Sequence, residues 1–151
     1  MHSHDHQLCM TEAEALCAKA GESLTPLRRR VLELLLDAPG PAKAYDLLTQ
    51  LGDDSGAAKP PTIYRALEFL LQVGLAHKIE SLNAFVACSD PHDHGTHAHG
   101  VTAFAICEDC GAVSEFHDDV IETRLTAWQK TQHFKPEKTT IEIRGHCRAC
   151  S

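Results

Sequence analysis

Apolar residues recur at helical spacing in four successive segments of the first half of the chain. Thr11 opens a capping box, and Gly21 stops the segment that follows. Thr25 and Pro26 begin the second segment, because a capping hydroxyl followed by proline is typical of a helix start. The sequence therefore predicts four helices. They span residues 11–20, 25–38, 43–51 and 60–73.

After Gly74 the pattern changes from helical to extended. Residues 75–79 and 84–88 are short strand candidates, and the polar residues 80–83 separate them. Helices followed by a two-stranded hairpin make a winged helix-turn-helix, in which the last helix before the wing reads DNA.

The second half of the chain opens with a segment, residues 89–100, that is poor in apolar residues and rich in His, Asp and Gly. Strand patterns follow at residues 101–107 and 112–116. Asp118 or Asp119 can then cap a helix that carries Ile121, Leu125 and Trp128 at helical spacing. A last strand is predicted at residues 139–144.

The predicted fold class is α+β, with two domains joined by a hinge. A winged helix-turn-helix domain takes residues 1–88, of which 1–10 are expected to be disordered. Residues 89–100 form a His-rich hinge, and residues 101–151 form a small αβ domain.

Four of the seven cysteines form two Cys-x-x-Cys pairs, Cys107 with Cys110 and Cys147 with Cys150. This spacing lets both thiolates of a pair meet one tetrahedral zinc ion at about 2.3 Å. A domain of this size has a thin core, so a closed four-cysteine site would contribute directly to its folding. A redox dithiol and an iron–sulfur centre are the alternative interpretations.

We expect the chain to lie in the cytoplasm, where cysteines stay reduced and are available to metals. No stretch is apolar enough for a membrane helix, and the first residues lack the pattern of a signal peptide. The formal charge of −7 argues mildly against nucleic-acid binding. However, basic residues gather in the first half, at Arg28–Arg30, Lys59 and Arg65, so that half can present a basic face.

Several segments together resemble the ferric uptake regulator family, and within it the zinc uptake regulator branch. They are Leu24-Thr-Pro-Leu-Arg28, Ala44-Tyr-Asp-Leu-Leu48, Lys59-Pro-Pro-Thr-Ile-Tyr-Arg-Ala-Leu67, Gly74-Leu-Ala-His-Lys-Ile-Glu-Ser81, Phe85-Val-Ala-Cys88 and Cys107-x-x-Cys-Gly111. The resemblance implies a homodimeric repressor of zinc-uptake genes that binds operator DNA when loaded with zinc. It also implies that the C-terminal domain is the dimerisation domain.

The helix over residues 60–73 would then read the operator. Arg65 can donate two hydrogen bonds to guanine. Tyr64 can bond a phosphate or contact a thymine methyl, and Thr62 lies on the same helical turn. The resemblance adds Tyr45, at a family position that reaches DNA. Arg28 and Lys59 are predicted to contact phosphates, which position a protein without specifying a sequence.

A second, regulatory zinc is implied by the resemblance. Its ligands map onto His77, Cys88, Glu115 and a hinge histidine. His99 is nearest the expected position but needs a one-residue insertion, and His97 is the alternative. One thiolate with nitrogen and oxygen ligands suits zinc, whereas a set without sulfur suits iron or manganese. A third, weaker site is a further candidate, from His92 and His94 with His117 or Asp118.

Rival functions remain open at this point. A sensor of iron, manganese, nickel or peroxide belongs to the same family, and a zinc buffer or chaperone would use the histidine clusters. No enzyme is predicted: the zinc deaminase pattern, the P-loop and the Gly-x-Ser-x-Gly and His-Glu-x-x-His motifs do not occur. No small-molecule substrate or membrane partner is expected. The three histidines within residues 2–6, Cys9 and Cys17 receive no ligand role.

Overall fold

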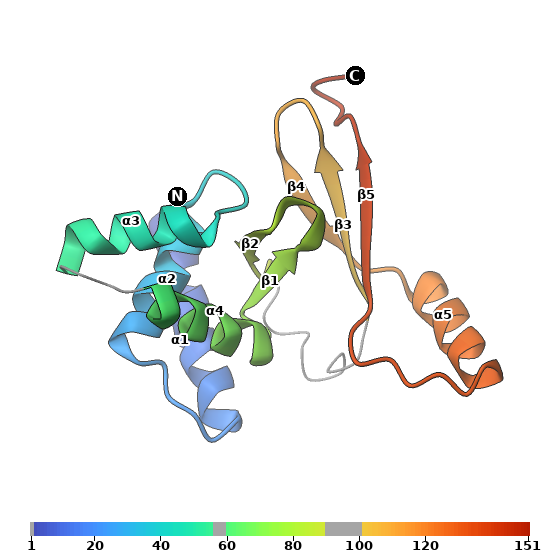
Figure 1. Ribbon diagram of the computed structural model, residues 1–151, viewed down its shortest axis with the longest axis horizontal. Helices are drawn as coiled ribbons and strands as arrows, with labels where there is room; N and C mark the ends of the chain where they lie inside the picture. The colour runs from blue at the N-terminus through green and yellow to red at the C-terminus, as the bar shows by residue number, and fades with distance from the viewer. Residues whose placement is uncertain (1, 56–59, 90–100) are drawn as a thin grey trace. The chain divides into compact units, whose positions relative to one another are not determined.

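The computed structural model describes residues 2–55, 60–89 and 101–151 (Figure 1). The chain divides into two compact units, Met1–His92 and Asp93–Ser151. The first unit is helical with a small hairpin, and the second holds a three-stranded sheet and one helix. This is the predicted α+β class. Among the described residues, no helix has the length and apolar character needed to cross a membrane.

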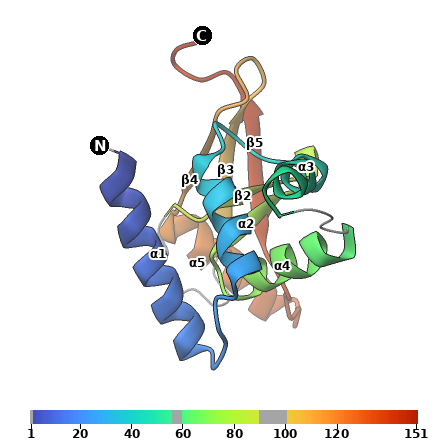
Figure 2. The ribbon, with the colours of Figure 1, turned by 90° about the vertical axis from the view of Figure 1, so that its left-hand side faces the viewer.

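The described part of the first unit contains four α-helices. They are α1 (His2–Lys19), α2 (Pro26–Asp37), α3 (Ala44–Ser55) and α4 (Pro60–Gln72). In Figure 2, α2 lies between α1 and α4. The predicted second, third and fourth helices are confirmed, although α3 runs four residues beyond the predicted end at residue 51.

The predicted start of the first helix at Thr11 is wrong. The α1 helix already begins at His2. The physical reason is visible in its buried face: Met10, Ala13 and Cys17 are all buried in one core at i, i+3 and i+7 spacing. Because Met10 already belongs to this stripe, the helix passes through Thr11, and the threonine does not cap it.

The core of the first unit is built from the apolar stripes of these helices. Fully buried members include Val31, Leu47, Leu51, Ile63, Leu67 and Leu70. The predicted cap of α2 is confirmed, because the Thr25 hydroxyl accepts a hydrogen bond from the Arg28 N–H at 3.4 Å. Gly74 ends the α4 segment with φ of 81°, a left-handed conformation that glycine adopts without strain.

The wing is an antiparallel hairpin of β1 (Ala76–Ile79) and β2 (Ala84–Ala87), as predicted. A 3₁₀ turn, η1 (Glu80–Leu82), connects the strands, and Asn83 closes it in the left-handed conformation. Ala42, in the loop before α3, exchanges two backbone hydrogen bonds with Phe85 of β2, at 2.8 and 2.9 Å. The wing is therefore joined to the helices by backbone pairing.

The second unit contains a sheet of order β4-β3-β5. Its strands are β3 (Thr102–Cys107), β4 (Val113–Phe116) and β5 (Thr140–Gly145). The β3 and β4 strands are antiparallel, whereas β5 runs parallel to β3, with Cys107 opposite Gly145. The parallel register brings the end of β3 beside the end of β5, so both cysteine pairs emerge at one end of the sheet.

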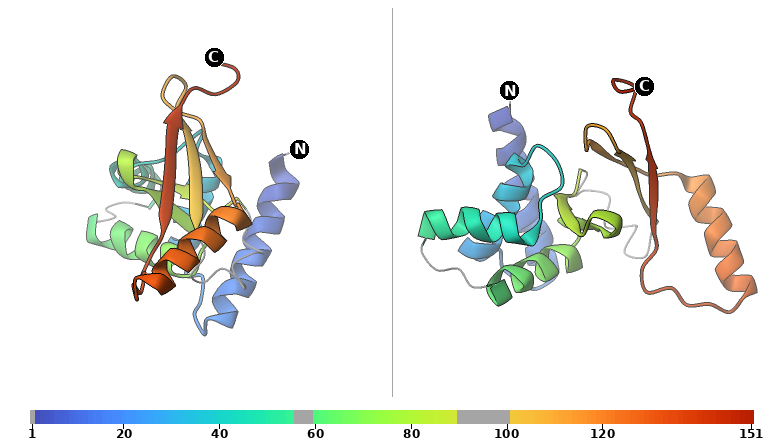
Figure 3. Two further views of the ribbon diagram at one scale, coloured as in Figure 1. Left: turned by 90° about the vertical axis from the view of Figure 1, so that its right-hand side faces the viewer. Right: turned by 45° about the horizontal axis from the view of Figure 1, so that its top comes forward.

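The helix of the second unit, α5 (Asp119–Thr131), begins at the predicted cap. The Asp118 carboxylate accepts from the N–H groups of Val120 and Ile121, each at 3.0 Å. None of the residues of α5 is buried. Figures 1 and 3 show the reason: α5 stands beyond the end of the strands and does not cover a face of the sheet. Its apolar stripe is therefore only partly covered within its own unit, where the Trp128 ring lies 6.0 Å from the Phe134 ring.

Candidate metal centres and nucleic-acid interface

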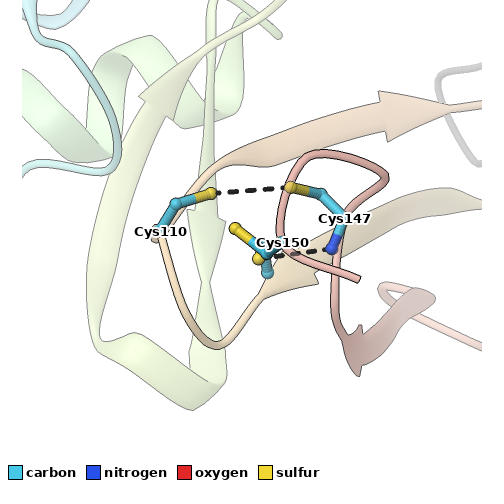
Figure 4. A group of neighbouring side chains, drawn as sticks. Cys110, Cys147 and Cys150 are labelled. Carbon is cyan, nitrogen blue, oxygen red and sulfur yellow. Dashed lines mark hydrogen bonds between the residues drawn. The ribbon is translucent and has the colours of Figure 1, made fainter.

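The two cysteine pairs meet in the second unit. The sulfur atoms of Cys107, Cys110, Cys147 and Cys150 all lie within 4.8 Å of one another. Figure 4 shows the Cys110 and Cys147 side chains pointing toward each other, with the Cys150 sulfur beside them. The Cys110 and Cys147 sulfurs are 3.8 Å apart. The structure thus brings together all four predicted ligands of the structural site.

Backbone geometry holds each pair in place. Cys107 is the last residue of β3, and the chain turns back at Gly111, where φ is 74°. The Gly111 N–H donates to the Cys107 carbonyl at 3.0 Å, and the Cys150 N–H donates to the Cys147 carbonyl at 2.9 Å. The Cys147 N–H donates to the Cys107 sulfur at 3.3 Å, which joins the two pairs directly. Each pair therefore lies in a tight turn closed by a backbone hydrogen bond.

The four thiols lie close enough to shift the pKa values of one another. Backbone N–H groups of Cys110 and Cys147 lower the pKa of Cys107 to about 6, because they stabilise its thiolate. Side-chain hydrogen bonds with the other three thiols raise the pKa of Cys150 to about 12. The pKa of Cys110 is also raised. Four sulfurs this close cannot all ionise by themselves, whereas a divalent cation among them would favour the thiolates.

The donor set fits zinc. A regular tetrahedron with Zn–S bonds of about 2.3 Å has sulfur–sulfur edges of about 3.8 Å. This is the separation of the Cys110 and Cys147 sulfurs, 3.8 Å. Four soft sulfur donors with no open position are typical of a structural rather than a catalytic zinc site. When bound, the ion would supply the positive charge that holds four thiolates together.

Two polar side-chain contacts around the cysteines were not predicted. The Asp109 carboxylate lies 2.8 Å from Nδ1 of His146, and the Glu108 carboxylate lies 2.9 Å from the Arg144 guanidinium. Each pair joins an acidic residue of the first cysteine turn to a basic residue just before the second. The first Cys-x-x-Cys encloses two acids and the second follows Arg144 and His146, but the pairing itself depends on the register of β3 and β5.

The predicted regulatory ligands of the first unit lie together. Cys88 follows β2, and its N–H donates to the Leu75 carbonyl at 2.9 Å, which continues the hairpin pairing. His77 in β1 pairs with Val86, so Cys88 and His77 are diagonal neighbours on one face of the hairpin. The Cys88 sulfur and an imidazole nitrogen of His77 lie within 4.8 Å. Both atoms are near enough to share one metal ion.

The remaining predicted regulatory ligands do not belong to the first unit's hairpin. Glu115 belongs to β4 of the second unit, where its carboxylate lies 3.4 Å from Nε2 of His117. His99 and its alternative His97 lie outside the described residues, as do His92 and His94. Asp118, suggested for the third site, caps α5 with its carboxylate.

The residues of α3 and α4 that are predicted to contact operator DNA are exposed. Tyr45 at the start of α3 has 76% of its surface exposed, and Tyr64 in the first turns of α4 has 52%. Thr62 and Arg65 are exposed on α4 as well. No described residue forms an ion pair with Arg65, whose guanidinium is thus available to a ligand. Lys59 lies outside the described residues.

Arg28 has a different setting from the one predicted for a phosphate contact. Its guanidinium lies 3.5 Å from the ring centroid of Phe69 in α4. It also donates to the Ser23 carbonyl at 2.8 Å and lies 3.7 Å from the Glu22 carboxylate. The side chain is thus engaged within the first unit, a role that the sequence did not indicate.

A winged helix-turn-helix unit joined to a small αβ unit with four clustered thiols defines a class of two-unit, metal-binding winged-helix proteins. The model of the ferric uptake regulator family matches residues 19–144 of this chain. The chain therefore belongs to the ferric uptake regulator family.

Particular relatives are similar over nearly the whole chain. The zinc uptake regulation protein of Escherichia coli strain K12 is 40% identical over 144 residues, covering 95% of this chain and 82% of the relative. The solved structure of a zinc uptake regulator complexed with zinc and DNA matches with a TM-score of 0.86 at 38% identity, covering 95% of this chain and 93% of that one. The crystal structure of holo XcZur matches with a TM-score of 0.84 at 39% identity, covering 95% and 96%.

Proposed function

We propose that this protein is a zinc-responsive transcriptional repressor, acting in the cytoplasm, that binds operator DNA as a zinc-loaded dimer and controls zinc-uptake genes. The observation that carries the proposal is the likeness to a zinc uptake regulator complexed with zinc and DNA, which extends over 95% of this chain. A fold alone would not define a function. Here the exposed helix residues and the thiol cluster supply the two chemistries that such a regulator needs.

In this proposal, exposed residues of α3 and α4 contact the operator and read its sequence. Arg65 donates two hydrogen bonds to a guanine edge, a contact worth about 1–3 kcal/mol of discrimination. Tyr64, Thr62 and Tyr45 contact phosphates or thymine methyl groups around it. Lys59 adds a phosphate contact that positions the helix without reading sequence.

Two zinc ions per subunit are assigned. The structural ion belongs to the four clustered thiols described above, and it keeps the second unit folded. The regulatory ion belongs to His77, Cys88 and Glu115 together with His99, or His97 in its place. A thiolate with imidazole and carboxylate ligands selects zinc over harder metals. In this proposal the winged-helix domain, residues 1–88, and the dimerisation domain, residues 101–151, are joined by the hinge 89–100.

The regulatory ligands are divided between the two proposed domains, which explains how a metal can act as a switch. Ligand groups on both sides of a hinge favour one domain arrangement when they share an ion. Moving an equilibrium from 1:99 to 99:1 needs about 5.5 kcal/mol of differential affinity. The ligands of the structural zinc lie within one unit, so binding of that ion does not favour one domain arrangement over another.

Dimerisation is assigned to the second unit because its apolar side chains are left open. Trp128 of α5 is 55% exposed and Phe134 is 57% exposed, and their ring centroids are 6.0 Å apart. Val120 and Ile143 are exposed in the same unit. Aromatic residues of this kind anchor the buried centre of protein interfaces. A second copy of the chain would cover them.

The proposal is tested by a DNA mobility shift assay against zinc concentration, with a chelator added back. We expect binding to an operator fragment only when zinc is present, with loss on chelation. The Arg65→Ala variant should lose operator binding while dimerisation and zinc content stay unchanged. A protein that binds the operator equally with and without zinc, or an Arg65→Ala variant with unchanged sequence preference, would refute the proposal.

A further inference from the structure

The Arg28 side chain connects three parts of the first unit. Its guanidinium stacks over the Phe69 ring at 3.5 Å from the centroid, well inside the range of a cation–π contact. On the other side it donates to the Ser23 carbonyl and pairs with Glu22, both in the loop between α1 and α2. Arg28 itself stands in the first turn of α2, where its N–H is held by the Thr25 hydroxyl.

The planar guanidinium is suited to this position. Stacking uses its face, which leaves the N–H groups in its plane to donate to the loop. A lysine ammonium is a compact charge on a flexible stem and cannot make both kinds of contact with the same geometry. The Arg28 side chain is 27% exposed, so a large part of it is removed from water.

The ring that Arg28 contacts belongs to the reading helix. Phe69 is 6% exposed and lies one helical turn after Arg65, four residues along α4. Residues four apart share a helix face. Because a helix is rigid over this distance, a constraint on the rotation and axial position of the Phe69 ring also constrains where Arg65 and Tyr64 are presented.

We propose that Arg28 is a positioning residue for α4: it fixes the placement of the reading helix through Phe69 and does not serve mainly as a phosphate contact. The inference rests on the proposed DNA-binding function for its consequence, but the contact itself can be tested without DNA. It revises the expectation from sequence, in which the charge of Arg28 was directed to the DNA backbone.

The first experiment measures unfolding of the zinc-loaded protein in denaturant, without DNA. Arg28→Lys keeps the charge, Arg28→Leu removes it, and Phe69→Leu removes the ring. The double variant Arg28→Leu/Phe69→Leu completes the cycle. We expect a coupling of about fivefold in the unfolding equilibrium constant between the two positions. We also expect Arg28→Lys to lose most of the stability that Arg28→Leu loses. If the effects of the two single variants on unfolding are additive, Arg28 and Phe69 do not interact energetically, and the proposal is wrong whether or not the protein binds DNA.

The second experiment separates positioning from phosphate contact and from simple stabilisation. Affinities of the zinc-loaded protein for an operator fragment and for a random duplex are measured at several salt concentrations, at a temperature where every variant is folded. We expect both Arg28 variants to lose about tenfold in operator affinity, while random-duplex affinity and the salt slope stay at wild-type values.

Two other results would overturn the proposal. A lost phosphate contact weakens both duplexes and reduces the slope of log K against log salt by about 0.9 per contact. Unchanged operator affinity in folded Arg28→Leu would mean that the contact only stabilises the unit. A wild-type protein that binds neither duplex in a zinc-dependent way contradicts the proposed function instead. The unfolding cycle would then still decide on the contact.

Discussion

The two units of this protein are stabilised in different ways. The first unit buries a continuous set of leucine, isoleucine and valine side chains between its helices and wing. In the second unit the buried apolar residues within the described chain are Ala103, Phe104, Ile106 and Cys107, all of β3, while Trp128 of α5 is exposed. The first unit can therefore rely on its own core. In the proposed function, the second unit gains stability from a metal at the thiols and from a second copy over the exposed side chains.

Of the changes considered, removal of a metal ligand should have the largest effect: it should unfold the second unit and leave the first unit folded. Cys150→Ser removes one thiolate, and we expect the zinc content to fall by roughly one ion per chain and the second unit to unfold. The helical signal of the first unit should persist. The chain has a single tryptophan, Trp128 in α5, so its fluorescence reports on the second unit alone. A second unit that stays folded and dimeric without its zinc would contradict the comparison.

A core truncation in the first unit should affect stability without touching the metal. Leu47 in α3 is fully buried, and Leu47→Ala is expected to cost about 2–5 kcal/mol of unfolding free energy. The change should appear as an earlier denaturant midpoint of the helical circular dichroism signal. The matched control is Tyr45→Ala on the same helix. Because that side chain is 76% exposed, the change should alter stability by about 0.5 kcal/mol or less.

The exposed aromatic of the second unit should matter for association rather than for folding. Trp128→Ala is expected to weaken dimerisation by about 2 kcal/mol or more, roughly thirtyfold in Kd, as for an anchor residue of an interface. Sedimentation equilibrium at several protein concentrations measures the change. Zinc content at the thiols serves as the control, and it should not move. An unaltered dimer constant would place the interface elsewhere.

The ion pairs beside the cysteines should give the smallest effect. Asp109 and His146 are both about half exposed, so solvent screens their attraction. A double-mutant cycle with Asp109→Asn and His146→Gln should show a coupling of about 0.2–1 kcal/mol in the unfolding of the second unit. High salt should reduce it. A coupling that does not respond to salt would indicate a hydrogen bond rather than an ion pair.

Sequence reasoning located the elements and the thiol site because both depend on local spacing. A Cys-x-x-Cys turn specifies its own geometry, and the Thr25-Pro26 cap specifies the start of α2. The first helix was misplaced because Thr11 and Glu14 form a valid local capping signal. That signal was overridden by the burial of Met10 in the core.

Contacts between distant segments could not be predicted in the same way. The Arg28 guanidinium meets Phe69 only after α2 and α4 have packed, and nothing in either local sequence indicates the pairing. The charged pairs around the cysteines also depend on the parallel register of β3 and β5. The residues that carry such interactions look like ordinary surface charges until the topology is known.

The most direct test of the account asks whether one proposed zinc site is structural and the other regulatory. DNA binding to an operator fragment is followed by fluorescence anisotropy during a zinc titration, for the wild type and for Cys88→Ser, each with its structural zinc already bound. We predict that the wild type binds the operator as zinc rises. Cys88→Ser should keep the zinc at the four thiols and the dimer but lose the response. A Cys88→Ser protein that still responds to zinc like the wild type would contradict the account.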